Sequence, residues 1–140
     1  MAIVMSIKPE WCEDIFDGKK RYEVRKTIPK NMKTNTKVYV CQSGSGGVVG
    51  EFTAIKVFKF PGPCVEPEYY QSIEWLFLAG TCLTSRQLLD YLGDAKHFYE
   101  IVIKDPVLYK TPIQLSEFGL NRPPVSWCYA KTNDTTGNKQ

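Results

Sequence analysis

The chain has 140 residues, of which 43% are hydrophobic and 13% aromatic, and this is enough for one substantial core but too little for two independent domains. Its 18 Lys and Arg residues against 15 Asp and Glu give a net charge of +3. That charge is far below what a protein needs to grip long duplex DNA through many phosphates, so any anion-binding site must be local.

The first part of the chain predicts a strand followed by a helix. Ala2–Ile7 is apolar and β-branched, which favours a strand, and Pro9 suits the first turn of a helix because it has no N–H group. Gly18 is the expected end of this helix, which covers Pro9–Asp17. Apolar residues four apart predict the face turned to the core: Trp11 with Ile15, and Cys12 with Phe16.

A charged strand is expected directly after this helix. Arg21–Arg25 alternates, so Tyr22 and Val24 would face the core while Glu23 and the two arginines face the other way. Lys20 has the parity of the core-facing residues. It can join the charged group only if it lies in the turn before the strand begins.

Two longer strands, Val38–Gln42 and Val48–Phe60, are predicted on either side of the glycine-rich residues 44–47. These glycines are not a dinucleotide-binding fingerprint, because a β-branched segment follows them where that motif needs a helix. Glu51 lies in the middle of an otherwise apolar strand and needs a partner if it is buried. Arg25 or Lys20 is the expected partner.

The next segment predicts two short helices. Prolines between residues 61 and 67 mark a loop, and Glu68–Leu78 then has apolar residues at helical spacing. Thr84 and Gln87 resemble a capping box for a second helix over Ser85–Leu92.

Strands are expected again near the end of the chain. His97–Lys104 alternates and is interrupted by Asp105 and Pro106, and Val125–Ala130 predicts a final strand. Residues 131–140 are expected to form a flexible polar tail. The order of strands and helices predicts an α+β fold with a curled sheet.

The cysteine pattern and the apolar runs exclude several classes of protein. The five cysteines are an odd number without a CxxC pair, so neither a disulfide framework nor a zinc site is indicated, and we expect core thiols, no metal and no cofactor. His97 is the only histidine, which makes a histidine-based triad hard to build. The segment before Lys8 is too short for a signal peptide and no apolar run approaches a membrane span. We therefore expect a cytoplasmic protein without membrane contact.

One group of residues has an unusual spacing. Gly18, Lys20, Glu23 and Arg25 form the pattern GxKxxExR directly after the predicted strand and helix. With the flanking run SIKPEWCEDIFDGKKRYEVRKTIPK, the strand ending in VVGEF, the LSEFG turn and the closing PPVSWCYA, this pattern resembles the ASCH domain family of PUA-like proteins. The resemblance covers roughly residues 3–130.

This resemblance implies a single ASCH or PUA-like domain over residues 1–130. The implied fold is a curled β-barrel of about five to six strands with two to three helices. It also implies a cleft between helices and sheet, lined by the GxKxxExR residues, that is proposed to take RNA. The oligomeric state stays open.

The chemistry of the motif fits such a cleft. Glu23 and Arg25 are two apart on one strand face, so they can orient one another while Arg25 offers a planar fork to a phosphate or a base edge. A structural ion pair that closes the barrel is the alternative. Further binding residues are expected near the motif, although Trp127 can equally be a core residue: Ser6, Lys8, Gln42, Ser43, Glu51, Ser126 and Trp127.

Three functions remain open. The first is a binding module for RNA, a nucleotide or a nucleoside. The second is a small hydrolase, an amidohydrolase on modified cytidine or a ribonuclease, with Lys20 and Glu23 as catalytic residues. The chain departs from the amidohydrolases of the family, which carry threonine at the position of Glu23. The third is a protein-interaction adaptor that uses the aromatic residues Tyr69, Tyr70 and Trp75.

Overall fold

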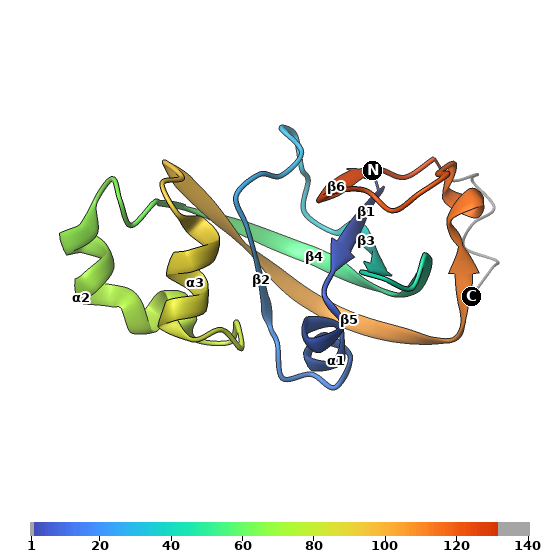
Figure 1. Cartoon of the computed structure of the whole chain (residues 1–140), viewed down its shortest axis with the longest axis horizontal. Helices are drawn as coiled ribbons and strands as arrows, with labels where there is room; N and C mark the ends of the chain where they lie inside the picture. Colours follow the sequence, from blue (N-terminus) through green and yellow to red (C-terminus); the bar gives the residue numbers. More distant parts are fainter. Residues whose placement is uncertain (1, 132–140) are drawn as a thin grey trace.

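The computed structural model describes residues 2–131, and these form one mixed sheet with helices packed on it (Figure 1). The α+β class and the expected numbers of strands and helices are confirmed for this part of the chain. The strands are β1 (Ala2–Ile7), β2 (Tyr22–Arg25), β3 (Thr36–Gln42), β4 (Gly47–Pro61), β5 (His97–Gln114) and β6 (Trp127–Tyr129). The helices are α1 (Pro9–Phe16), α2 (Pro67–Leu78), α3 (Ser85–Leu92) and the short 3-10 helix η1 (Leu115–Phe118). The predicted tail, residues 131–140, lies outside the described residues except for its first position.

The sheet is curled but open. Its strand order is β2-β5-β4-β3-β1-β6, with β1 and β3 parallel and the other pairs antiparallel. Within residues 2–131 no ladder joins the two outer strands β2 and β6, so hydrogen bonding does not close the predicted barrel. The gap between these strands is where the motif residues lie.

The strand β5 is longer than the sequence predicts. Asp105 and Pro106 were expected to end it, but it continues to Gln114. Asp105 has a φ of 51°, and the register with β4 jumps from the pair Thr53–Lys104 to the pair Glu51–Val107. The proline therefore lies at a bulge, where its missing N–H group costs no ladder hydrogen bond.

Both faces of the sheet are covered. Ile3, Met5 and Ile7 of β1 pack with Cys12 and Ile15 of α1 on one face, as the alternation of a buried strand requires. On the other face of β1, Val4 belongs to a second core with residues of β3, β4 and η1. The charged motif residues thus follow a helix that is held firmly against the sheet.

The helices α2 and α3, which connect β4 to β5, form a separate layer at one end of this long antiparallel pair, whereas η1 lies near the other end (Figure 1). Phe77 of α2 and Leu88 and Leu92 of α3 pack on Val24 of β2 and Phe98 of β5. The predicted capping box is confirmed, because the Gln87 N–H donates to the Thr84 hydroxyl and the Thr84 N–H to the Gln87 side chain. No helix within residues 2–131 is long and apolar enough to cross a membrane.

Candidate nucleotide-binding site

The turn between α1 and β2 fixes the position of Lys20. Gly18 has a φ of 85°, which favours glycine, and the Lys20 N–H donates to the Asp14 carbonyl at 2.9 Å. The Arg21 N–H then donates to the carbonyl of Gly80, after α2, at 2.7 Å. Lys20 therefore lies in the turn before the edge strand, which is the position that lets it join the charged group.

Glu23 and Arg25 are buried on β2 and linked to each other. Their exposed fractions are 5% and 8%, and the Arg25 Nε–H donates to the Glu23 Oε2 at 2.9 Å. The two terminal nitrogens of Arg25 reach across the gap in the sheet, where one donates to the Ser6 carbonyl at 2.7 Å and the other to the Ser126 hydroxyl at 3.2 Å. Arg25 thus connects β2 to the β1 edge, where the backbone does not close the sheet.

Lys20 is the most deeply placed cation of the group, with 2% of its surface exposed. Its Nζ donates to the Thr81 carbonyl and lies 3.6 Å from the Glu23 Oε1. It also lies 5.3 Å from the centroid of the Trp11 ring, within the range of a cation–π contact. The carboxylate of Glu23 therefore has a cation on each side.

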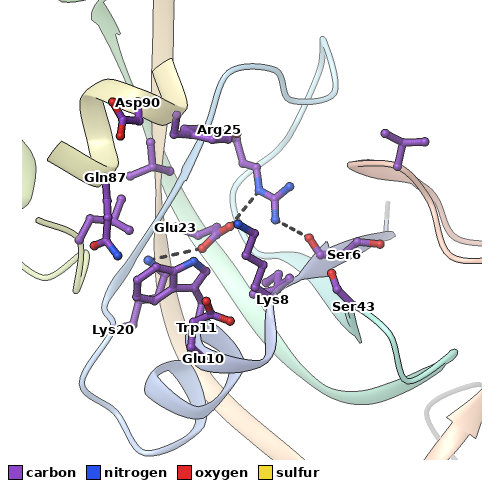
Figure 2. A pocket seen from close by; sticks show the side chains of 15 residues that line it. Ser6, Lys8, Glu10, Trp11, Lys20, Glu23, Arg25, Ser43, Gln87 and Asp90 are labelled. Atoms are coloured by element: carbon purple, nitrogen blue, oxygen red, sulfur yellow. Dashed lines mark hydrogen bonds and ion pairs between the residues drawn. The ribbon is translucent and has the colours of Figure 1, made fainter. Parts of the chain in front are cut away.

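These residues line a cavity of about 540 Å³ between α1, β2, α3 and the ends of β1 and β3 (Figure 2). Lys8, at the start of α1, and Ser43, just after β3, line the same cavity. Ser6 also lines it, and its hydroxyl donates to the Pro124 carbonyl at 2.6 Å. The structure thus brings Ser6, Lys8 and Ser43 together with the motif.

The charges around the cavity are balanced. The lining contains three cations and three carboxylates, which are Lys8, Lys20 and Arg25 against Glu10, Glu23 and Asp90. Such a lining suits a ligand with both hydrogen-bond donors and acceptors better than it suits a run of phosphates.

Two aromatic side chains line the cavity from opposite elements. Trp11 packs against the core as expected, but it is only partly buried, and it also lines the cavity beside Lys20 and Glu10 (Figure 2). Tyr91 of α3 accepts a hydrogen bond on its hydroxyl from the Lys26 N–H at 3.3 Å, and burial raises the pKa of this hydroxyl. The Lys26 ammonium group lies 5.0 Å from the centroid of the Tyr91 ring, so each of the two rings has a lysine beside it.

The contribution of α3 was not found from the sequence. Leu83, Gln87, Asp90 and Tyr91 all line the cavity. The capping box predicts this helix, but the face that it turns to the motif depends on how Leu88 packs in the α2–α3 core. That packing joins segments far apart in the chain, and local periodicity carries no information about it.

Three further residues of the predicted binding set lie away from the cavity lining. Gln42 pairs with Ile7, and its neighbour Ser43 reaches the cavity instead. The Trp127 indole N–H donates to the Thr27 hydroxyl at 3.2 Å, and the ring packs against the core under α1. Ser126 contacts the site through Arg25, and its carbonyl accepts the Ser6 N–H at 2.9 Å.

Glu51 has other partners than those expected. It is 3% exposed and accepts hydrogen bonds from the Lys37 ammonium group and, at 2.7 Å, from the Tyr109 hydroxyl. It pairs with Tyr39, whose ring belongs to the core on the face away from α1. The expectation that Arg25 or Lys20 would neutralise it was wrong, because the strand alternation directs Glu51 to the opposite face.

A second buried glutamate was missed by the sequence analysis. Glu100 of β5 is 4% exposed, pairs with Val24, and its Oε2 has no hydrogen-bond partner within residues 2–131. Burial raises the pKa of its carboxyl group to about 8, and the charge of Lys20 acts in the opposite direction. The signal in the sequence was an acid that shares a strand face with the core residue Phe98.

The cysteines are only partly as expected. Cys12 and Cys41 are buried, and burial raises the pKa of the Cys12 thiol to about 12, but Cys64 and Cys82 are exposed and are not core residues. All five thiols are free. His97 is exposed with its ring 5.5 Å from that of Tyr99. Residues 2–131 contain no cluster of three or more groups suited to a metal ion.

Comparisons with known proteins agree with this architecture. The model of the ASCH domain family matches residues 5–103, and no curated protein matches the chain. The crystal structure of ASCH from Zymomonas mobilis is similar at a TM-score of 0.73 with 20% identity, covering 99% of this chain and 92% of that one. A mutant form of it gives 0.74 with 21% identity, covering 99% and 94%. The crystal structure of hypothetical protein PH0355 gives 0.53 with 16% identity, covering 76% and 100%.

Proposed function

The chain belongs to the ASCH domain family, and from this premise we propose that it binds RNA or a nucleotide by taking one nucleobase into the cavity around Lys20, Glu23 and Arg25. In this proposal residues 1–130 act as one binding domain. The observation that carries it is the cavity itself, in which a buried ionic group and two aromatic rings meet within about 540 Å³. This size falls in the usual range for small-molecule sites, roughly 300 to 1,000 Å³.

The hydrogen-bonding capacity left in the site matches a base edge. Arg25 has five N–H donors, of which three are used by Glu23, Ser6 and Ser126, so two remain for a carbonyl, a ring nitrogen or a phosphate. Glu23 has spare acceptor positions for an exocyclic amino group. Arg25 as donor beside Glu23 as acceptor can therefore recognise the hydrogen-bonding edge of a base. The aromatic rings of Trp11 and Tyr91 are suited to contacts with the flat face of the base.

The pairing of the cations in the cavity determines where a phosphate group of the ligand would bind. The deep cations Lys20 and Arg25 are already paired with Glu23, whereas Lys8 is exposed at the start of α1 and has no such partner in the described part of the chain. A 5′-phosphate or a chain phosphate would therefore meet Lys8, while the base occupies the interior.

Hydrolysis is the second candidate, favoured by the 3.6 Å contact between the Lys20 ammonium group and Glu23 inside a cavity. As a nucleophile or base, Lys20 would have to give up its bonds to Glu23 and to the Thr81 carbonyl. Binding needs no such change, so we place it first. Turnover of acetylated nucleosides or of RNA that disappears in Glu23→Gln would reverse this order.

The adaptor function has less support. Tyr70 is 3% exposed and stacks on Phe77, so it is not available to a partner, whereas Tyr69 and Trp75 are exposed on α2.

The five free thiols fit a reducing compartment such as the cytoplasm, which we propose as the location.

The proposal is tested by removing the one exposed cation of the cavity. Lys8→Ala should weaken the binding of nucleoside monophosphates and of a short single-stranded RNA, and the slope of log affinity against log salt should fall by about 1. Titration calorimetry at several salt concentrations measures both. Lys110→Ala, an exposed cation on β5 outside the cavity, is the matched control and should change neither. Equal losses in the two variants, or no binding to the wild type, would reject the proposed site.

A further inference from the structure

Three carboxyl groups are buried on the strands that carry the site and its surroundings, and one of them lacks a hydrogen-bond partner. Glu23 and Glu51 accept charged hydrogen bonds, but the Glu100 Oε2 has no partner within residues 2–131. A buried polar atom without a partner costs free energy that a sequence normally avoids. Glu100 therefore calls for an explanation that the packing of β5 does not supply.

The position of Glu100 connects it to Lys20. It pairs with Val24, between the positions of Glu23 and Arg25 on β2. Residues that are directly opposite in an antiparallel pair project to the same face, so Glu100 lies on the face covered by α2 and α3. Lys20 lies in the turn that leads into this edge strand, where it can approach both faces. It touches Glu23 on one face, and its charge acts on Glu100 on the other.

The remaining surroundings of Glu100 are nearly free of charge. Its direct pair on β4 is Phe58, over whose ring the Lys56 ammonium group lies at 5.0 Å. The α2 side of the cluster contributes the Tyr70 hydroxyl, which lies near the Ser85 hydroxyl and the carboxylate of Glu74. From α3 the cluster receives only leucines. Among the charged groups within residues 2–131, Lys20 is the one whose charge lowers the pKa of the Glu100 carboxyl group, against the larger effect of burial.

We propose that Glu100 is a positioning residue of the site: it is a second carboxyl partner of Lys20, and its protonation state determines how Lys20 is presented to a ligand in the cavity. With Glu100 neutral, Lys20 is shared between Glu23 and the Thr81 carbonyl, as the structure shows. When Glu100 releases its proton to solvent, Lys20 lies between two carboxylates. The surroundings of Lys20 then carry one extra negative charge, which weakens the attraction of Lys20 for a base carbonyl and of the whole site for an anionic ligand.

The pH range in which Glu100 changes its protonation state follows from its burial. Because burial raises the pKa of Glu100 to about 8, the change from neutral acid to carboxylate falls between about pH 7 and 9. Affinity for an anionic ligand should therefore be highest below this range and fall as the pH rises through it. Glu100→Gln keeps the size of the neutral acid and removes the titration, so its affinity should stay at the low-pH level.

The first experiment uses the free protein and does not depend on the proposed function. Carboxyl carbons of ¹³C-labelled glutamate are followed by NMR from pH 5 to 10 in the wild type and in Lys20→Met. Glu100 should titrate near 8 in the wild type and higher in Lys20→Met, because the ammonium charge is lost. If Lys20→Met does not fold, the Lys20 side-chain resonances of the wild type and of Glu100→Gln are compared, and only the wild type should shift over this range. Titration in the ordinary carboxyl range, or no mutual effect, overturns the proposal.

The second experiment rests on the proposed function and asks whether the pair controls binding. The affinities of the common nucleoside 5′-monophosphates are measured at pH 6.5 and 9 for the wild type, for Glu100→Gln and for Glu68→Gln, an exposed acid on α2 that serves as the matched control. The wild type and the control should lose about tenfold in affinity at the higher pH, and Glu100→Gln should lose much less. Equal losses in all three overturn the role of Glu100. Absence of binding in all three, with the NMR coupling intact, rejects the proposed ligand and leaves the Glu100–Lys20 pair established.

Discussion

Two buried glutamates on neighbouring parts of one sheet have different surroundings. Glu23 and Glu51 are 5% and 3% exposed, and each is neutralised by a lysine and one further donor. The side chain of Lys37, beside Glu51, is 40% exposed and opens to solvent. That of Lys20, beside Glu23, is 2% exposed and opens to the cavity.

The comparison of Glu23 with Glu51 shows that a buried, paired carboxylate does not by itself indicate a ligand site. Both acids have cationic partners because an unpaired carboxylate inside a sheet is unstable, and that requirement is the same on either face. At Glu23 the paired charges border a cavity that Trp11 and Tyr91 also line, whereas Glu51 is not among the residues that line it. The cavity, and not the ion pair, therefore distinguishes a ligand site from a structural network.

The largest expected effect is that of replacing each glutamate by glutamine, and it separates a ligand site from a structural ion pair. Glu23→Gln should destabilise the fold by about 3 kcal/mol or more, because it leaves Lys20 and Arg25 buried without their carboxylate partner. Glu51→Gln should cost less, because the side chain of Lys37 is 40% exposed and can be solvated. Chemical denaturation measures this loss. Ligand affinity should fall at least tenfold in Glu23→Gln alone.

Equal affinities for the wild type and Glu23→Gln would show that the ionic group is only structural and closes the gap in the sheet. A comparable loss in Glu51→Gln would show that binding depends on the whole sheet and not on the cavity.

Glu100, the third buried acid, extends the comparison because its Oε2 has no hydrogen-bond partner within residues 2–131. Burial raises the pKa of Glu100 from its ordinary value of 4.5 to about 8 in the folded protein, so between these values the folded state binds more protons than the unfolded state. Its contribution to stability should therefore be full below about pH 4.5 and fall as the pH rises to about 8, by at most about 1.4 kcal/mol per pH unit. Glu100→Gln should flatten this decline in denaturation curves taken from pH 5 to 9. A decline of the same slope in the variant would contradict the raised pKa.

A smaller effect is expected at the turn that positions Lys20. Gly80 has a φ of 75°, its carbonyl accepts the N–H groups of Arg21 and Tyr22, and an added Cβ would lie 2.7 Å from the Tyr22 ring. Gly80→Ala should cost about 1–3 kcal/mol and shift Lys20 while Lys37 and Glu51 stay in place. Thermal unfolding and NMR shifts measure the two effects. Gly44→Ala, also at positive φ but with open space around it, is the control for backbone strain alone. Equal perturbation near Glu51 would contradict this local role.

The sequence predicted the elements that depend on local patterns. Ala2–Ile7 and the α3 capping box follow from apolar, β-branched composition and from cap chemistry, and both are found. The strand parity set the condition that Lys20 must lie in the turn to join the charged group, and it lies there. The motif likewise predicted that Glu23 and Arg25 share a strand face, and their hydrogen bond shows it.

The features that the sequence did not predict depend on contacts between segments far apart in the chain. The bulge at Asp105 lets β5 continue because β4 tolerates a shift in register there, and nothing near Pro106 in the sequence signals it. The partner of Glu51 was mistaken because the choice between sheet faces depends on strand register. Glu100 was missed because burial by α2 and α3 makes an ordinary-looking acid significant.

The central claim is that the cavity beside the buried ionic group takes a nucleobase, and the tryptophans test it most directly. The indole N–H resonances of Trp11, Trp75 and Trp127, assigned with Trp→Phe variants, are followed by NMR while nucleoside monophosphates or a short single-stranded RNA are added. Trp11 lines the cavity, whereas Trp75 is 69% exposed on α2 outside it. We predict a saturable shift of the Trp11 indole with Trp75 unchanged. A shift of Trp75 with Trp11 unchanged would contradict the account and place the ligand on α2.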